Sequence, residues 1–344
     1  MLSPKYAFIS AFLKGEEAKS VTPEHIDKMT AVSNLQDALA VIRETDVGSY
    51  LEESPVKVFD DLDKYLWHYL SQRIRYITSF KLIPKDILKL CRAYVVKYDI
   101  LNIKAALQGI ATGKKASMVP VGIIHDSALV DELSTAENLD EIIQLLVKSR
   151  LRDYVPALEQ YKTDGGVKST LVLQAKLDSQ YYESMLSVSR TISDGHVLAR
   201  IVGIAIDLTN LEIVMRSLID GTKADISEYT IAGGYMLTGQ GIKNLSSSEL
   251  AEVPTKLWDT PYQDIAKEVL SSYEMTKSIS AVSEVIDKHK FRLTKELLAT
   301  RILSSLVVAW YLIIKEIEIR NLRLVLKSII DGISVQEIKN YLVF

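Results

Sequence analysis

The spacing of apolar residues along the chain predicts helices almost throughout. Over residues 273–298 the apolar side chains form one stripe with a period of about 3.6, which is typical of an amphipathic helix. We therefore expect one long helix there, and further long helices over residues 59–80, 87–107, 171–186 and 197–218. Alternating strand patterns of five or more residues are scarce. The sequence therefore predicts an all-α protein.

Helix starts and stops can also be located. Thr22 followed by Pro23 predicts an N-cap with proline in the first turn, and Ser33 precedes a run rich in Ala and Leu. The most apolar stretch, Ile302–Ile314, has thirteen residues, whereas a membrane span needs roughly 20. We expect it to be a buried helix.

The most informative feature is an internal repeat. The segments Tyr98–Gln108, Ile206–Arg216 and Ile317–Lys327 align without gaps and share the pattern apolar, acid, apolar, any, Asn, apolar. The acids and asparagines of the three copies are Asp99 and Asn102, Asp207 and Asn210, and Glu318 and Asn321. Successive acids are separated by 108 and 111 residues, close to a third of the chain, so chance is a poor explanation.

A second block supports the same period. Gly122 lies eleven residues before Leu133, and Gly234 lies eleven before Leu245. In the third copy the match resumes at Tyr262, seventeen residues after Leu245 instead of six, which implies an insertion of eleven residues. Each unit thus consists of a head of short helices followed by a pair of long helices.

The predicted domains are residues 1–112, 113–221 and 222–344. A unit of about 110 residues can bury a small core of its own, so the copies are expected to behave as domains rather than as solenoid layers. Three units related by rotation form a closed ring or funnel with an axial cavity. An unbranched stack of three is the competing arrangement, and the sequence leaves the two open.

Within each copy the acid and the Asn lie three residues apart, on one face of a helix and among aliphatic neighbours. Buried polar groups need partners, so our main hypothesis is a structural contact that fixes the register between the two long helices of each unit. The alternative is that the three acids gather on an axis and grip a cation or a basic shaft.

Composition and charge exclude several classes of protein. The chain is 48% hydrophobic and 25% charged, with 41 basic against 44 acidic residues and a net charge of −3, which disfavours disorder and nucleic-acid binding. The single cysteine, Cys91, excludes an intramolecular disulfide and any multi-cysteine zinc site, and suits the cytosol. The N-terminal residues 1–13 lack the pattern of a secretory signal.

No motif assembles a catalytic, cofactor or metal site. The stretch Gly109–Lys115 has one residue too few between its glycines for a phosphate loop and reads as a helix C-cap, and Gly233–Gly241 reads as a turn before a short helix. The five histidines lack metal-ligand spacing, and no Gly-x-Ser-x-Gly occurs. We therefore expect no catalytic residue, cofactor or metal.

The repeated helices carry a family resemblance. The segments Trp310–Arg323 and Lys97–Lys104, together with the opening Tyr6–Ala11, resemble the C subunit of archaeal-type ATP synthases and the d subunit of vacuolar-type ATPases. The likeness covers essentially the whole chain, and its C-terminal motif is the most specific part.

This resemblance implies a funnel of three similar helical domains in pseudo-threefold arrangement, standing on the cytoplasmic face of the membrane proteolipid rotor ring. In that family the cavity receives the lower end of the central shaft, formed by the D and F subunits, so that torque is coupled to proton or sodium transport. Such proteins are not enzymes and bind no cofactor. A peripheral cytoplasmic location, no nucleic-acid partner and no homo-oligomer are expected.

Within this resemblance, we predict that the short helices around 22–39, 127–147 and 245–269 face the ring loops, because they are the lesser, more polar helices at one end of each unit. Two hypotheses from other classes stay open. A helical adaptor unrelated to rotary motors would share the repeat but would not bind a ring or shaft. An enzyme using the three acid and Asn pairs as a metal site would require Asp99, Asp207 or Glu318 for turnover.

Overall fold

Six long helices dominate the structure. The computed structural model describes residues 4–53, 59–81, 83–164, 170–221 and 226–344, and its regular structure there is helical with no strand, which confirms the all-α prediction. The long helices are α5 (Phe59–Thr78), α6 (Lys85–Thr112), α11 (Thr170–Ser189), α12 (Gly195–Ile219), α16 (Ser280–Leu298) and α17 (Leu306–Asp331). They form three consecutive pairs, each joined by a short turn.

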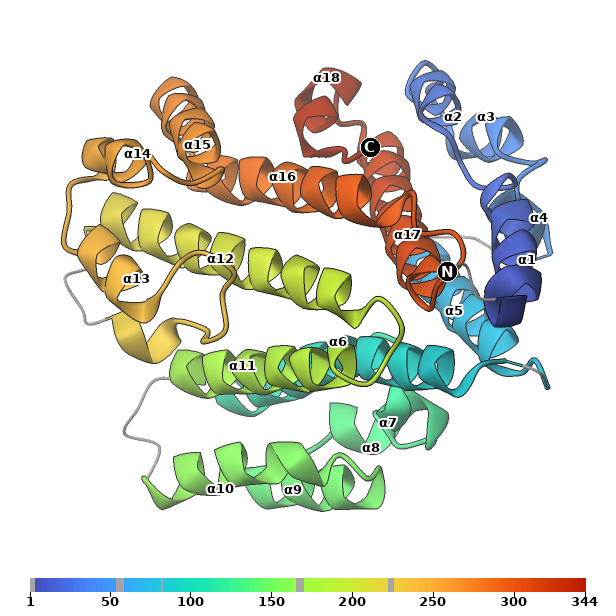
Figure 1. The fold of residues 1–344 in the computed structure, drawn as a ribbon. Coiled ribbons are helices and arrows are strands. Elements are labelled where there is room, and N and C mark those ends of the chain that lie inside the picture. The colour runs from blue at the N-terminus through green and yellow to red at the C-terminus, as the bar shows by residue number, and fades with distance from the viewer. Residues whose placement is uncertain (1–3, 54–58, 82, 165–169, 222–225) are drawn as a thin grey trace.

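Groups of short helices, here called heads, precede each long pair. The first head is α2 (Pro23–Met29), α3 (Leu35–Val41) and α4 (Asp46–Glu52), after the N-terminal α1 (Ala7–Glu17). The second is α7 (Ile123–Asp126), α8 (Val130–Ser134), α9 (Leu139–Lys148) and α10 (Val155–Thr163). The third is α13 (Gly239–Ser246), α14 (Val253–Lys256) and α15 (Tyr262–Thr276), and α18 (Val335–Ile338) follows the last long helix. The three heads lie apart at the periphery (Figure 1).

The long helices contact one another in a series that returns to its start. Helix α6 packs against α11, α11 against α12, α12 against α16, and α16 against α17. Helix α17 then packs against both α5 and α6. Figure 1 shows α6, α11, α12 and α16 crossing the middle of the molecule, with α17 and α5 at one side.

Buried apolar side chains form three clusters, and each cluster draws on both sides of a predicted repeat boundary. One joins the second half of α6 to the second head and α11. Another joins α12 to the third head and α16, and the largest joins α17 to the first head and α5. The second and third heads therefore pack on the long helix that precedes them as well as on the one that follows them, and the first head packs on α5 and on α17, the last long helix. The predicted start of the third repeat, residue 222, lies outside the described residues.

Several predicted helix ends are confirmed. The Thr22 hydroxyl accepts the His25 N–H at the start of α2, with Pro23 in the first turn. Gly113 ends α6 in the left-handed conformation, with φ +66°. The prediction of Ser33 as an N-cap is wrong by one residue, because the Asn34 side chain accepts the Asp37 N–H instead.

The single helix expected over residues 273–298 is wrong. Helix α15 ends at Thr276, Lys277 adopts a left-handed conformation with φ +51°, and α16 starts at Ser280. The stripe looked continuous because α15 and α16 bury their apolar faces in the same cluster.

The apolar stretch over residues 302–314 is mainly a buried helix, as expected, but the helix begins only at Leu306. Ile302 lies before that start and is 46% exposed. Among the helices of the described residues, none is long and apolar enough to cross a membrane.

Candidate functional site: three buried acid and asparagine pairs

The first pair lies in the middle of α6 and holds the segment that leads into the second head. The Asp99 carboxylate accepts the backbone N–H groups of Ile123 and Ile124, both at 2.9 Å. The Asn102 amide binds Val119 twice, donating to its carbonyl at 2.9 Å and accepting its N–H at 2.8 Å. Both side chains are buried. These bonds satisfy backbone donors at the start of α7, where a helix leaves its first N–H groups unpaired.

The second pair repeats this geometry on α12. The Asp207 carboxylate accepts the N–H groups of Met236 at 2.7 Å and Leu237 at 3.1 Å. Asn210 exchanges two hydrogen bonds with the backbone of Ile231, both at 2.8 Å. The Tyr262 hydroxyl, on α15, donates a further bond to Asp207 at 2.7 Å. The second long pair is thereby tied to the third head.

The third pair, on α17, connects the two ends of the chain. Asn321 exchanges two hydrogen bonds with the backbone of Val343 near the C-terminus, at 2.7 and 3.1 Å. Glu318 accepts the N–H of Val21 at 2.6 Å, just before α2, although the two residues lie 297 positions apart. Helix α17 therefore holds the first head, just as α6 holds the second head and α12 holds the third.

A buried lysine neutralises the third acid. The Lys315 ammonium, on α17 and 0% exposed, lies 3.0 Å from both carboxylate oxygens of Asp46 and 2.9 Å from Glu318 Oε2. Asp46 begins α4 of the first head. This ion cluster ties the first head to α17 a second time.

The repeated glycines allow the loops to approach the acids closely. A Cβ placed on Gly122 would lie 2.4 Å from Asp99 Oδ1, and one on Gly234 would lie 2.0 Å from Asp207 Oδ1. Both distances are shorter than any real contact. Gly122 also has φ +115°, which side chains disfavour. Contact with the carboxylates therefore explains why glycine occupies this position in both loops.

Burial shifts the acidity of all three carboxyl groups in the same direction. Desolvation raises the pKa of Asp99 to about 7, against the lowering effect of its two backbone donors. It also raises the pKa of Asp207, opposed by the Tyr262 hydroxyl, and that of Glu318, opposed by the Lys315 ammonium. The three sites thus differ in what compensates a buried charge.

The partners differ from those that the sequence suggested. We expected each pair to fix the register between two long helices of one unit, but all six side chains bind backbone groups of head or terminal segments. The reason is that a loop crossing a helix brings unpaired N–H and C=O groups, which an acid and an amide on one face can bind together. Each of the three acids binds a different segment of the chain, and the alternative that they gather on an axis stays a hypothesis.

A set of ion pairs between the long helices had no signal in the sequence. Lys104 of α6 lies 2.5 Å from Asp178 of α11, and Arg320 of α17 lies 3.0 Å from Asp287 of α16. Three further pairs join Lys97 to Glu316, Arg323 to Asp63, and Lys290 to Glu212. Because their spacing follows no motif, only the packing of the helices identifies them. In the part of the chain that the structure describes, no group of three or more His, Cys, Asp or Glu could hold a metal ion.

Comparison with known proteins identifies the family. The model of the ATP synthase (C/AC39) subunit matches residues 9–341. This chain belongs to the ATP synthase C/AC39 subunit family. All six repeat residues, from Asp99 to Asn321, lie inside the matched region of this C/AC39 chain. The family resemblance drawn from the sequence is thereby confirmed.

Relatives of this C/AC39 chain carry a consistent name. The A-type ATP synthase C subunit of Methanocaldococcus jannaschii is 26% identical over 353 residues, covering 98% of this chain and 86% of the relative. The C subunit of Methanosphaera stadtmanae is 25% identical, covering 94% and 83%. That of Thermococcus kodakarensis is 24% identical, covering 98% and 90%. The similarity therefore spans nearly the full length of this chain and most of the length of each relative.

Proposed function

We propose that this chain is the non-catalytic central-stalk component of an A-type rotary ATP synthase. It acts as a socket between the membrane proteolipid ring and the central shaft of the D and F subunits, and it transmits torque for proton or sodium transport. Its three units form a funnel around the shaft end, at the cytoplasmic face of the membrane. In this role it does no chemistry of its own, and the names of its relatives point to the same complex.

The observation that carries the proposal is the way in which the heads are held. Asp99 and Asp207 bind the head that follows them, and Glu318 on the last long helix binds Val21 of the first head. Each unit is thus bonded to the next, and the last to the first. A coupling element under torque needs this, because an open series of units could shear apart at its free ends.

The distribution of charge between the heads and the turns supports one orientation of the chain between the ring and the shaft. The head segments 19–53, 113–164 and 226–276 hold 23 acidic against 12 basic residues. The turns between paired long helices, residues 73–92, 187–200 and 292–305, hold 11 basic against 3 acidic residues. Cytoplasmic loops of membrane proteins carry an excess of Lys and Arg. The acidic heads therefore complement the ring loops, which leaves the basic turns for the shaft.

A reconstitution tests this function. Membranes with the complete complex should pump ions during ATP hydrolysis, whereas a complex assembled without this chain should hydrolyse ATP without pumping, because the shaft no longer turns the ring. The full-length chain should also bind isolated rings and the shaft of the D and F subunits. A chain that binds neither, or whose omission leaves pumping unchanged, would instead be a helical adaptor outside the motor.

A further inference from the structure

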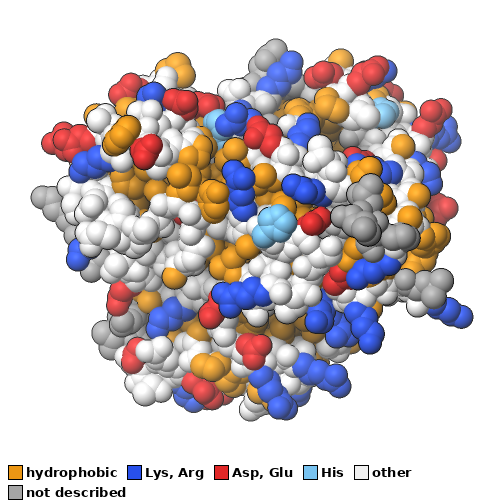
Figure 2. Space-filling model, in the orientation of Figure 1, with side chains coloured by type: hydrophobic (Ala, Val, Ile, Leu, Met, Phe, Trp, Pro, Cys, Tyr) orange, Lys and Arg blue, Asp and Glu red, His pale blue; other side chains and the backbone are white. Residues whose placement is uncertain are grey.

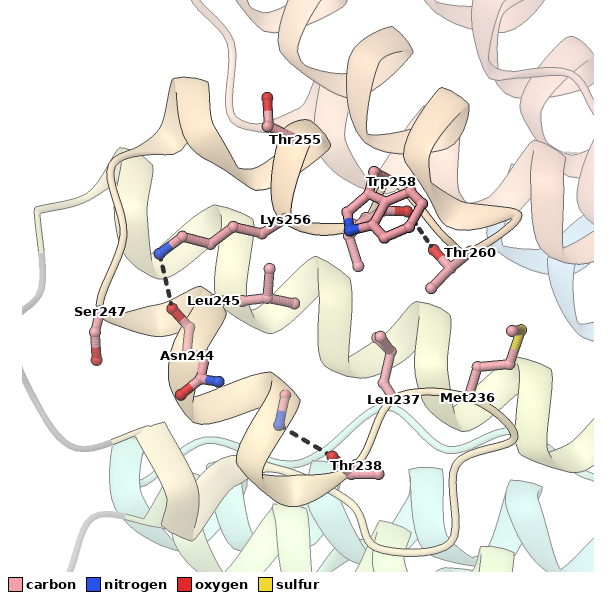
Figure 3. A pocket seen from close by; sticks show the side chains of 12 residues that line it. Met236, Leu237, Thr238, Asn244, Leu245, Ser247, Thr255, Lys256, Trp258 and Thr260 are labelled. Carbon is pink, nitrogen blue, oxygen red and sulfur yellow. Dashed lines mark hydrogen bonds between the residues drawn. The ribbon is translucent and has the colours of Figure 1, made fainter.

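The third head contains a segment that the other heads lack. The eleven-residue insertion detected from the sequence falls between Leu245 and Tyr262. It folds into a short 3-10 turn at Leu250–Glu252, helix α14 and the turn that carries Trp258. These elements stand opposite α13 and the loop before it (Figure 3). The insertion therefore builds one wall of a groove.

This groove has a volume of about 770 Å³ and a mixed lining. Leu237, Leu245 and Leu257 are buried there, while Thr238 and Thr260 contribute hydroxyl groups. At its edge the Trp258 side chain is 73% exposed, and Met236 is 41% exposed. Figure 3 shows the Trp258 ring standing above the groove from the α14 side. An exposed tryptophan beside a concave, partly apolar surface is typical of a protein interface.

The groove is held rigidly by the buried Asp207. One wall contains Leu237, whose N–H donates to Asp207, and the other wall ends at Tyr262, whose hydroxyl donates to the same carboxylate. Across the mouth, the Lys256 ammonium donates to the Asn244 carbonyl at 3.4 Å. Both walls are therefore fixed before any partner arrives, which lowers the entropic cost of binding.

The charge around the groove selects a cationic partner. Figure 2 shows acidic and basic side chains interspersed with apolar ones over one face of the molecule, so the balance of each head has to be taken from its residues. Residues 226–276 contain seven acidic and three basic residues. Asp259 is exposed directly beside Trp258, and no cation among the described residues lies within ion-pair distance of it. Glu249 is exposed on the insertion as well, whereas the exposed Glu252 pairs with Lys256 of the groove lining. A partner that fits has an apolar side chain next to a Lys or Arg.

We propose that this groove docks one cytoplasmic loop of the proteolipid ring, with an apolar side chain against Trp258 and a Lys or Arg beside Asp259. The inference rests on the proposed function, in which the acidic heads face the ring, and it adds that the contact is unequal among the three heads. The third head supplies the anchor, because it alone carries the insertion, and the first and second heads contribute mainly charge.

The groove is tested by titrating full-length chains with rotor rings embedded in nanodiscs. Trp258→Ala should weaken binding about tenfold or more, as for a tryptophan at an interface centre. Trp258→Phe should recover most of the affinity. The control is Phe8→Ala, since Phe8 is 64% exposed but lies on α1, outside the heads. Because Trp258 is largely exposed, thermal unfolding should be unchanged in Trp258→Ala and Trp258→Phe.

The outcomes separate the two proposals. If the unmodified chain binds rings and Trp258→Ala binds equally well, the proposed docking in the groove is wrong and the socket function stands. If the unmodified chain does not bind rings, the socket function fails with it.

A charge reversal at Asp259 provides a second test of the groove. Asp259→Lys should weaken ring binding more than Asp27→Lys, which reverses an exposed acid of the first head, and should flatten the dependence of affinity on salt. Equal effects of the two reversals would overturn a special role for the third head.

Discussion

The acid on α6 and the acid on α17 occupy equivalent positions in the repeat but are compensated differently. Asp99 has two backbone N–H donors and, among its described contacts, no cation. Glu318 has one backbone donor and the buried Lys315, which also binds Asp46. Asp99 holds a segment 24 residues further along the chain, whereas Glu318 holds one 297 residues away. A contact between distant segments closes a longer loop, which costs more chain entropy.

The largest loss of stability is expected when the ion cluster on α17 is disrupted. Lys315→Met removes the ammonium and leaves the buried Glu318 and the partly buried Asp46 without a counter-charge. Breaking a buried ion pair in this way costs about 3–5 kcal/mol of unfolding free energy. Urea denaturation measures it. The matched control, Lys28→Met, removes an exposed pair with Glu24 and should change stability by less than about 1 kcal/mol.

The corresponding change on the α6 side is Asp99→Ala, which leaves the N–H groups of Ile123 and Ile124 buried without an acceptor. Each unpaired donor costs about 1–3 kcal/mol, so we expect a total loss near 3 kcal/mol. Hydrogen exchange should speed up first around α7, where these donors lie. Uniform acceleration across all three heads would contradict the assignment of this acid to the second head.

An intermediate case is the α12 acid, whose extra donor is neutral. Tyr262→Phe removes the hydroxyl that binds Asp207 while keeping the ring, and should cost about 1.5–2 kcal/mol. The loss should be smaller than that of Lys315→Met because Asp207 keeps its two backbone donors, Met236 and Leu237. Thermal unfolding monitored by circular dichroism compares the two variants. A larger loss for Tyr262→Phe would reverse the ranking of the two sites.

The smallest expected effect is a pH dependence specific to Asp99. Its pKa in the folded protein is about 7, above that of the unfolded chain, so the folded state binds the extra proton as pH falls. Stability from this group is therefore fully present below the pKa of the unfolded chain, about 4, and is lost progressively as pH rises through the folded pKa near 7. The last part of this loss, roughly 1 kcal/mol, falls between pH 6 and 8.

The difference between the unmodified chain and Asp99→Asn isolates this carboxyl group. Burial lowers the pKa of His68 and His125, and these histidines act in the opposite direction over the same pH range. Their contribution is common to both proteins and cancels. Parallel pH profiles for the two proteins would contradict the raised pKa of Asp99.

Much of the architecture could be predicted from local pattern. The period of apolar residues identified the long helices, and the Thr22 cap was read from residues within a few positions of one another. The errors also have a local cause. The break at Lys277 was missed because α15 and α16 face one core, so the apolar stripe continues across a left-handed residue that no glycine marks.

The sequence alone determined that the protein is helical, that its pattern recurs about every 110 residues, and that each copy buries an acid and an asparagine. Only the tertiary structure decided what those side chains bind: Val21 for Glu318, the first turn of α7 for Asp99, and the loop before α13 for Asp207. It also decided that Lys315 binds Asp46. The period of apolar residues predicts which face of a helix is buried. The covering segment, up to 297 residues away, depends on the packing of the whole chain.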